Sequence, residues 1–208
     1  MSNYLLSHCN FIHIPKCGGT AVQSALWKLK TVTDKAAQEI TTPHHGHLFA
    51  SQMPENGKPF FSFVRNPVSW WMSFYHWNMN PAHSRFSTDE LTTTSFDEWI
   101  RDYGPFWLGF YTKLVRRYLG KDTLFPSANK VEIIGRTEHM YTDLRTMLNV
   151  IGQPYDVAVM NDLISGKLKF DSRRSNTQTY DRKAVSMESR ELIKKCEFYM
   201  YETFGYKL

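Results

Sequence analysis

The stretch FIHIPKCGGT, residues 11–20, limits the possible folds of this chain more than any other. An apolar run ends at Ile14, a turn with two glycines follows, and a helical pattern begins near Thr20. The first N–H groups of a helix have no partner inside it and the helix dipole is positive there, so a glycine-rich turn between a strand and a helix is typical of anion sites. We therefore expect an anion to bind against this turn.

The lysine of this stretch stands on an unusual side of the glycines. The common phosphate loop, G-x-x-x-x-G-K-[ST], carries its lysine after the glycines, whereas Lys16 precedes Gly18 and Gly19. From this place its ammonium group is expected to reach the anion from the strand side, while the glycines let the backbone approach without a Cβ in the way. A Gly-Gly turn that binds no ligand is the alternative interpretation.

Strand-like and helix-like patterns alternate along the rest of the chain. Strands are predicted over 11–14, 60–65 and 130–135, helices over 21–30, 67–77, 96–120, 138–151 and 186–204, and polar loops over 41–59, 78–95 and 165–180. This alternation predicts an α/β fold with a central parallel sheet flanked by helices, in which ligands bind at the carboxyl ends of the strands. The length suits a single domain that spans residues 1–208.

Composition favours an anionic ligand and a reducing compartment. The formal net charge is +5 with 22% charged residues, and no block of lysines or arginines resembles a nucleic-acid-binding arm. The three cysteines have no framework spacing, the beginning MSNYLLSHCN does not resemble a signal peptide, and no apolar run reaches the roughly 18 residues of a membrane span. We expect a cytoplasmic protein without nucleic-acid or membrane partners.

A second group of polar residues follows the predicted strand over 60–65. In FVRNPVSWWMSFY, residues 63–75, Arg65 ends the strand and Ser73 lies about two turns into the next helix. Both side chains can reach one phosphate if the helix folds back across the strand end. A surface ion pair for Arg65 and an ordinary helix-surface hydroxyl for Ser73 are the alternatives.

Several stretches resemble, in the same order, those of sulfotransferases that use 3′-phosphoadenosine 5′-phosphosulfate (PAPS), above all the carbohydrate branch of heparan sulfate 2-O and 6-O type (sulfotransferase family 2). HIPKCGGTA resembles the 5′-phosphosulfate loop, and VRNPVSWWMSFY resembles the 3′-phosphate motif. Residues 133–148, IIGRTEHMYTDLRTML, and residues 198–206, FYMYETFGY, resemble two later stretches. The resemblance implies a P-loop-like three-layer fold and an enzyme that sulfates a hydroxyl group of a saccharide or another small molecule.

The resemblance also implies which residues bind PAPS. Lys16 would lie by the bridging oxygen of the 5′-phosphosulfate as that bond breaks, and Arg65 and Ser73 would bind the 3′-phosphate. The other implied nucleotide contacts come from the glycine turn and from a late basic loop, RRSNTQ: Cys17, Gly18, Gly19, Thr20, Ala21, Arg173 and Arg174. The two arginines of the late loop can equally grip an anionic saccharide.

Two positions depart from the family pattern. Asn66 stands where the family has Asp, and we expect it to cap the following helix or to bond locally. Cys17 stands where the family has Thr, which removes a hydroxyl group. A cysteine beside an anion-binding turn can have a lowered thiol pKa, but we favour a packing role over that of a nucleophile.

Transfer to a hydroxyl group requires a base, and a histidine-rich loop precedes the strand over 60–65. The family often places a catalytic histidine here, in a Gly-His-apolar pattern that falls on His47. A neutral imidazole with a pKa of about 6.5 is a suitable base, so His47 is the predicted base. His45, Glu55 and Glu138 are the alternatives.

A zinc site formed by His44, His45 and His47 is a rival interpretation of the same loop. The adjacent side chains of His44 and His45 point apart, and sulfuryl transfer does not need a metal, so we predict none. His13 lies inside the first predicted strand and is expected to be packed and not catalytic. Most of the tryptophans, of which all but one lie within residues 60–111, are likewise expected in the core.

Two other classes of function are alternatives. A small-molecule or nucleoside kinase would share the strand, loop and helix, but G-x-x-x-x-G-K-[ST] is absent, as is a Mg²⁺ carboxylate after the second strand. A noncatalytic module that binds nucleotides or polysaccharides would not need Lys16, Arg65 and His47 together. Animal members of the family act in the Golgi lumen behind a membrane anchor. Because this sequence has no apolar run of that length, we expect a cytoplasmic bacterial or viral form, or an excised domain.

Overall fold

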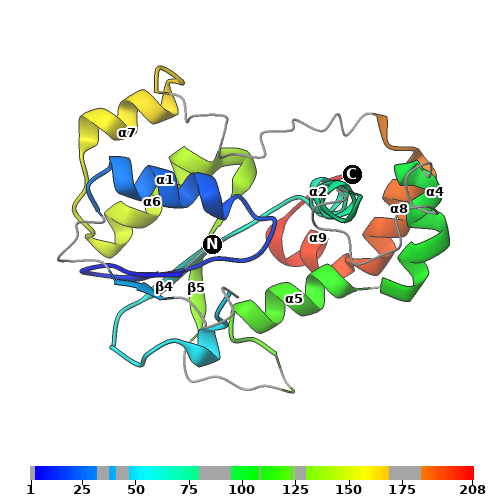
Figure 1. Ribbon diagram of the computed structural model, residues 1–208, viewed down its shortest axis with the longest axis horizontal. Helices are drawn as coiled ribbons and strands as arrows, with labels where there is room; N and C mark the ends of the chain where they lie inside the picture. Colours follow the sequence, from blue (N-terminus) through cyan, green and yellow to red (C-terminus); the bar gives the residue numbers. More distant parts are fainter. Residues whose placement is uncertain are drawn as a thin grey trace. The chain divides into compact units, whose positions relative to one another are not determined.

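The computed structural model describes residues 3–31, 38–40, 47–79, 95–107, 109–122, 124, 130–168 and 184–208. The chain, followed in Figure 1, forms two compact units. The first unit combines Met1–Arg65 with Leu114–Thr177, and the second combines Asn66–Lys113 with Gln178–Leu208. Each unit is made from two separate stretches of the chain. The single-domain organisation over residues 1–208 stays a prediction. No helix in the described ranges is long and apolar enough to cross a membrane.

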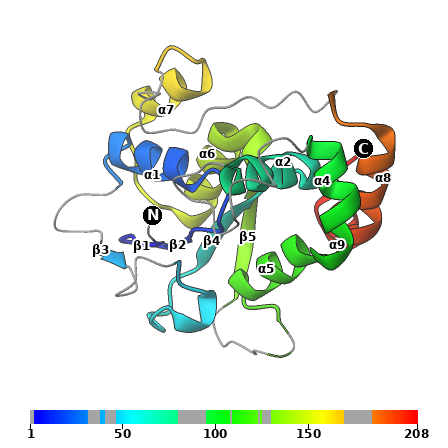
Figure 2. The ribbon, with the colours of Figure 1, turned by 45° about the vertical axis from the view of Figure 1, so that its right-hand side comes forward.

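A mixed sheet organises the first unit. Its strands are β1 (Asn3–Leu5), β2 (Asn10–Ile12), β3 (Gln38–Ile40), β4 (Phe60–Val64) and β5 (Val131–Arg136), in the order β3-β1-β2-β4-β5 (Figure 2). β2, β4 and β5 pair in parallel, whereas β1 pairs antiparallel with both β2 and β3. The α/β class is confirmed and the three predicted strands are the parallel ones, but the sheet as a whole is not parallel.

The two unpredicted strands, β1 and β3, contain three residues each, which is too short for an alternating pattern to stand out. A tight turn makes β1 antiparallel, because the Leu6 N–H donates to the Cys9 carbonyl over 2.8 Å and reverses the chain into β2. Gln153 supports this turn from outside the sheet, since its side-chain oxygen accepts from the His8 N–H at 2.9 Å.

The pairing of β2 with β4 decides where the candidate site lies. Phe11 is opposite Phe61 and Ile12 opposite Ser62, and every residue of both strands is buried. The Ser62 hydroxyl donates to the Ile12 carbonyl over 2.7 Å, which satisfies a polar side chain inside an apolar sheet. Because the two strands are parallel neighbours, their carboxyl ends lie at the same edge of the sheet.

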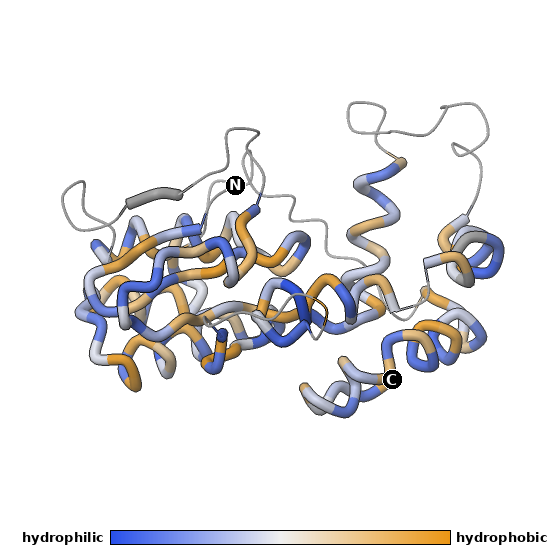
Figure 3. The backbone as a smooth tube through the Cα atoms, turned by 90° about the horizontal axis from the view of Figure 1, so that it is seen from below, coloured by the Kyte–Doolittle hydropathy of each residue, from blue (hydrophilic) through white to orange (hydrophobic). Residues whose placement is uncertain are grey.

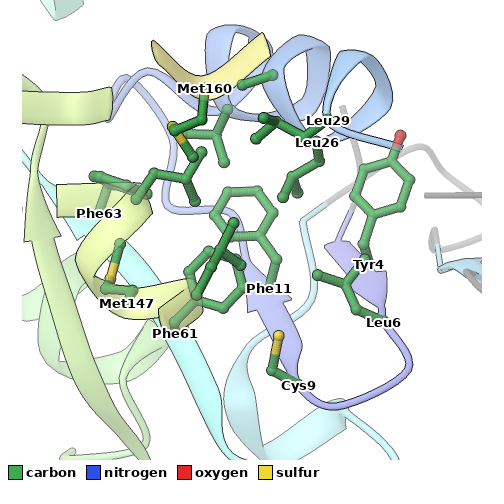
Figure 4. Close-up of a cluster of buried hydrophobic side chains, with 14 of the residues drawn as sticks. Tyr4, Leu6, Cys9, Phe11, Leu26, Leu29, Phe61, Phe63, Met147 and Met160 are labelled. Atoms are coloured by element: carbon green, nitrogen blue, oxygen red, sulfur yellow. The ribbon is translucent and has the colours of Figure 1, made fainter. Parts of the chain in front are cut away.

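Helices α1 (Gly19–Lys28), α6 (Met140–Ile151) and α7 (Val157–Ile164) cover one face of this sheet (Figures 1 and 2). Their apolar side chains meet those of β1, β2 and β4 in a buried cluster, which Figure 4 shows around Phe11 and Phe61. The two helices predicted here are confirmed as α1 and α6, the latter entered through the 3-10 turn η3 (Thr137–His139). α7 is an addition, begun by the Asp156 side chain, which accepts from the Val159 N–H at 3.1 Å.

The second unit is helical. It contains α2 (Pro67–Asn78), α4 (Phe96–Tyr103), the 3-10 turn η2 (Gly104–Trp107), the start of α5 (Phe110–Tyr118), α8 (Met187–Cys196) and α9 (Phe198–Phe204). Trp70 stacks on Tyr111 with ring centroids 4.5 Å apart, and Trp70, Trp71 and Trp99 are buried, which confirms that these tryptophans belong to the core. Hydrophilic and hydrophobic residues alternate along the helices near the C-terminus (Figure 3).

Two predicted helices of this unit are divided. The pattern over 96–120 breaks at η2, where Pro105 cannot continue an α-helix. The pattern over 186–204 breaks at Glu197, whose φ of −107° and ψ of 29° are not helical. Glu197 is 0% exposed, and its carboxylate accepts from the N–H groups of Tyr111 at 3.1 Å and Thr112 at 2.8 Å. The break therefore turns a buried carboxylate toward the start of α5.

Two more donors complete the surroundings of this carboxylate. The Thr112 hydroxyl donates to it over 2.6 Å and the Trp71 indole N–H over 3.2 Å. Burial raises the pKa of Glu197, while these donors oppose the rise because they favour the charged form. The first-turn N–H groups of α5 are thus satisfied by a side chain from a distant part of the sequence.

Replacement of this carboxylate is expected to destabilise the protein. Glu197→Ala removes the acceptor of four hydrogen bonds and leaves buried donors unpaired, which we expect to lower the free energy of unfolding by about 3 kcal/mol. Urea denaturation followed by tryptophan fluorescence measures the loss. Glu202→Ala, at an exposed position of α9, is the matched control and should change it by less than about 0.5 kcal/mol. Equal effects of the two changes would contradict this role.

Candidate anion-binding site

The turn after β2 has a left-handed backbone at two positions. Gly18, the residue before α1, has a φ of 72°, which suits glycine. Lys16 has a φ of 64°, which a residue with a Cβ adopts at a cost of about 1 kcal/mol. Lys30, the other non-glycine with positive φ in the described ranges, directly follows the cap of α1, where such a conformation is common. No helix end explains Lys16, so its conformation belongs to the turn itself.

The backbone N–H groups of the turn divide into two sets. The Cys17 N–H donates to the Ile14 carbonyl at 3.2 Å, and the Ala21 N–H donates to the Gly18 carbonyl at 2.9 Å. These two amides are engaged inside the turn and the first helical turn. That the amides of Gly18, Gly19 and Thr20 contact an anion stays a prediction from the resemblance.

Packing explains both glycines. A Cβ at Gly18 would overlap the Met140 side chain and would come within 3.2 Å of the Thr137 methyl group. A Cβ at Gly19 would overlap the ring of His13. The turn is therefore held between η3 and α6 on one side and a buried histidine on the other, which fixes the start of α1.

Arg65 joins the end of β4 to this turn. Its guanidinium donates through Nη1 to the Lys16 carbonyl over 3.2 Å. Both residues are half-buried. Burial first and the positive charge of Arg65 second lower the pKa of Lys16 to about 8. Two predicted phosphate ligands from separate motifs are thus brought together, and a bound anion would offset their mutual repulsion.

Cys17 and Asn66 behave as the sequence predicts. The Cys17 side chain is 1% exposed, which agrees with a packing role. The Asn66 side chain accepts from the Ser69 N–H at 3.2 Å and caps α2, so local bonding is confirmed. Ser73 lies half-buried on α2 in the second unit, and its approach to the phosphate of Arg65 stays a prediction.

A pair of histidines lies beside the same turn. The rings of His13 and His47 meet edge to face, with centroids 4.4 Å apart and an interplanar angle of 84°. Asn3 ties their backbones together, because its side-chain oxygen accepts from the His13 N–H at 2.7 Å while its NH₂ group donates to the Leu48 carbonyl at 2.9 Å. The predicted base thus stands next to the histidine that packs on Gly19.

Burial changes the protonation of both histidines. The pKa of His47 is lowered to about 4, mainly by burial and further by the positive amino terminus of the chain. The pKa of His13 lies well below its ordinary value because of burial first and the neighbouring His47 second. His47 is therefore a neutral imidazole across the neutral pH range, which differs from the pKa of about 6.5 assumed from sequence.

The remaining predicted residues fall elsewhere. Arg173, Arg174, His44 and His45 lie outside the described residues. Glu138, on η3, and Glu55 are exposed. Within the described ranges no three His, Cys, Asp or Glu side chains gather as metal ligands would, so a zinc site that involves His44 and His45 is left untested.

Two residues of the site were not predicted. His13 was expected only to be packed, and it is, yet it also contacts the predicted base and the predicted anion turn. Its place in the sequence, two residues before Pro15, was the one available signal. No sequence signal pointed to Asn3, because its role depends on β1, which the sequence pattern did not reveal.

Comparison of the chain with protein-family models and with curated proteins finds no match.

A methyl group added at Gly19 tests how tightly the turn is packed. Gly19→Ala should lower the free energy of unfolding by about 1–3 kcal/mol, because the new Cβ displaces the His13 ring. Gly104→Ala is the matched control, since its helical backbone accepts alanine and the nearest atom to the new Cβ would be 3.7 Å away. Urea denaturation compares the two. Similar stability of the Gly19→Ala and Gly104→Ala proteins would contradict the packing described here.

Proposed function

We propose that this protein is a sulfotransferase that moves the sulfuryl group of PAPS to an acceptor hydroxyl group, with a carbohydrate as the favoured acceptor. One observation carries the proposal: Arg65, at the end of β4, donates to the carbonyl of Lys16, in the turn after β2, at 3.2 Å. These are the two residues that the resemblance assigns to the 3′-phosphate and to the 5′-phosphosulfate. A P-loop-like three-layer arrangement of the fold is part of the same proposal.

The nucleotide would be held mainly by charge. Lys16 and the amides of Gly18, Gly19 and Thr20 form a positive end of α1 for the 5′-phosphosulfate. Arg65 offers a planar guanidinium with several N–H donors to the 3′-phosphate, with Ser73 as the proposed second contact. Arg173 and Arg174 are proposed to close over the nucleotide.

The proposed reaction is an in-line displacement at sulfur. The acceptor oxygen forms a bond to sulfur while the bond from sulfur to the 5′-phosphate oxygen breaks, and 3′,5′-adenosine diphosphate leaves. Lys16 stabilises the charge that develops on the leaving oxygen. His47 accepts the proton of the acceptor hydroxyl, for which its neutral imidazole is in the right state at neutral pH. No metal ion has a part in this scheme, because cationic side chains supply the positive charge.

A thermal-shift comparison tests the proposal against its alternatives. We expect 3′,5′-adenosine diphosphate to raise the melting temperature more than ATP or AMP at equal concentration, because stabilisation grows with ligand affinity. A shift with ATP that depends on Mg²⁺ would favour a kinase. A response to 3′,5′-adenosine diphosphate without sulfate transfer to any hydroxyl acceptor would favour a noncatalytic module.

The 3′-phosphate assignment predicts a selective loss of affinity. Arg65→Ala should weaken binding of 3′,5′-adenosine diphosphate by roughly tenfold to a hundredfold and binding of AMP far less, because AMP lacks the 3′-phosphate. Isothermal titration calorimetry measures both affinities. Arg65→Lys, which keeps the charge, should lose less, and Arg101→Ala, at an exposed position, should lose nothing. Equal losses for the two nucleotides would mean that Arg65 serves only to support the Lys16 turn.

The lowered pKa of Lys16 predicts a pH dependence. Lys16 binds an anion in its charged form, which is lost as pH rises through about 8. The affinity for 3′,5′-adenosine diphosphate should therefore fall by up to about tenfold between pH 7 and pH 9. In Lys16→Arg the side chain stays charged, so its affinity should be nearly flat over this range. A slope of the same size in both proteins would assign the titration to another group.

A further inference from the structure

The histidine pair contains an unexplained feature. The Nδ1 atoms of His13 and His47 are both buried and have no hydrogen-bond partner among the described residues. His13 is only 1% exposed, between Phe11, whose ring stacks at 6.2 Å, and the backbone of Gly19. A phenylalanine would fill such a place without leaving a polar atom unsatisfied. Packing alone therefore accounts for the ring of His13 but not for its nitrogen.

The two unsatisfied nitrogens lie on rings that touch. Their centroids are 4.4 Å apart, and Asn3 fixes the backbone of both segments. In the structure the two Nδ1 atoms make no hydrogen bond to each other. A protonated His47 is different, because an imidazolium carries N–H donors on both nitrogens and gains more from a buried acceptor.

We propose that His13 is a positioning residue for the base: when His47 accepts a proton at Nε2, its Nδ1–H donates to the Nδ1 lone pair of His13. This inference rests on the proposed function for its role in catalysis. The proton comes from the acceptor hydroxyl group, no further proton moves, and the charge stays on His47. His13 remains neutral and acts as the orienting acceptor, the part that a carboxylate plays in a Ser-His-Asp triad.

The neighbours of the pair suit this arrangement. Tyr118, from α5, has its ring centroid 6.4 Å from that of His47, and burial raises the pKa of its phenol, so it carries no charge at neutral pH. Arg117 lies over the ring of Phe49, which in turn contacts Tyr118, and the charge of the amino terminus disfavours the imidazolium of His47. Beside His47 the His13 ring presents a buried nitrogen that has no partner among the described residues.

Nuclear magnetic resonance titration of the full chain tests the pair without any nucleotide. In His13→Phe, which keeps the ring volume, the pKa of His47 should fall by about one unit, a tenfold loss of proton affinity. In His13→Gln, whose amide oxygen can accept, most of the loss should be recovered. His139→Phe, at an exposed position of η3, is the matched control and should leave His47 unchanged. An unchanged or raised pKa of His47 in His13→Phe would overturn the proposal.

The wild-type protein gives a second readout that does not depend on how the variants fold. Long-range ¹H–¹⁵N spectra at pH 7 report which ring nitrogen of His47 carries the proton. The proposal requires Nδ1–H with a free Nε2, so an Nε2–H tautomer would overturn it.

Transfer from PAPS to a desulfated glycosaminoglycan adds the catalytic readout. His13→Phe should lower kcat by roughly tenfold to a hundredfold with little change in affinity for 3′,5′-adenosine diphosphate, and His13→Gln should restore part of it. Full activity of His13→Phe would reduce His13 to a packing residue. If 3′,5′-adenosine diphosphate does not bind the wild type, the proposed function fails, while the titration still decides whether the pair exists.

Discussion

The parallel pairing of β2 with β4 is the contact on which the candidate site depends. It places the turn after Ile14 and the residue after Val64 at one edge of the sheet, so that residues 49 positions apart in sequence meet as Arg65 and Lys16. The pairing is secured by side chains that have no part in chemistry, among them the Ser62 hydroxyl on the Ile12 carbonyl. Strand register thus sets the spacing between the two cations.

Burial leaves the two kinds of titratable group at this edge in different charge states at neutral pH. It lowers the pKa of Lys16 and of His47 alike, because it disfavours the charged form of each. Lys16, lowered to about 8, remains a cation at neutral pH, whereas His47, lowered to about 4, remains a neutral imidazole. One physical effect therefore leaves a cation and a neutral imidazole at this edge, which are the states that the proposed function requires of an anion ligand and of a base.

The sequence predicts the parts of the fold that have strong local signals. The apolar runs of β2, β4 and β5 and the Pro67 start of α2 are such signals, and the strand–turn–helix order located Lys16 and Arg65 before any contact was known. β1 could not be predicted, since three residues carry no period and its direction comes from a turn. The contact of His13 with His47 depends on Asn3 and on tertiary packing, which no local pattern encodes.

The left-handed backbone of Lys16 has a consequence for how this chain can change. A glycine there would relieve the strained φ of 64°, which costs about 1 kcal/mol, while it would add entropy to the unfolded chain and remove the ammonium group. Under the proposed function, relief of backbone strain and anion binding favour different residues at this position. A search for stabilising substitutions that ignores ligand binding would therefore test glycine at position 16, and under the proposed function that change would weaken anion binding.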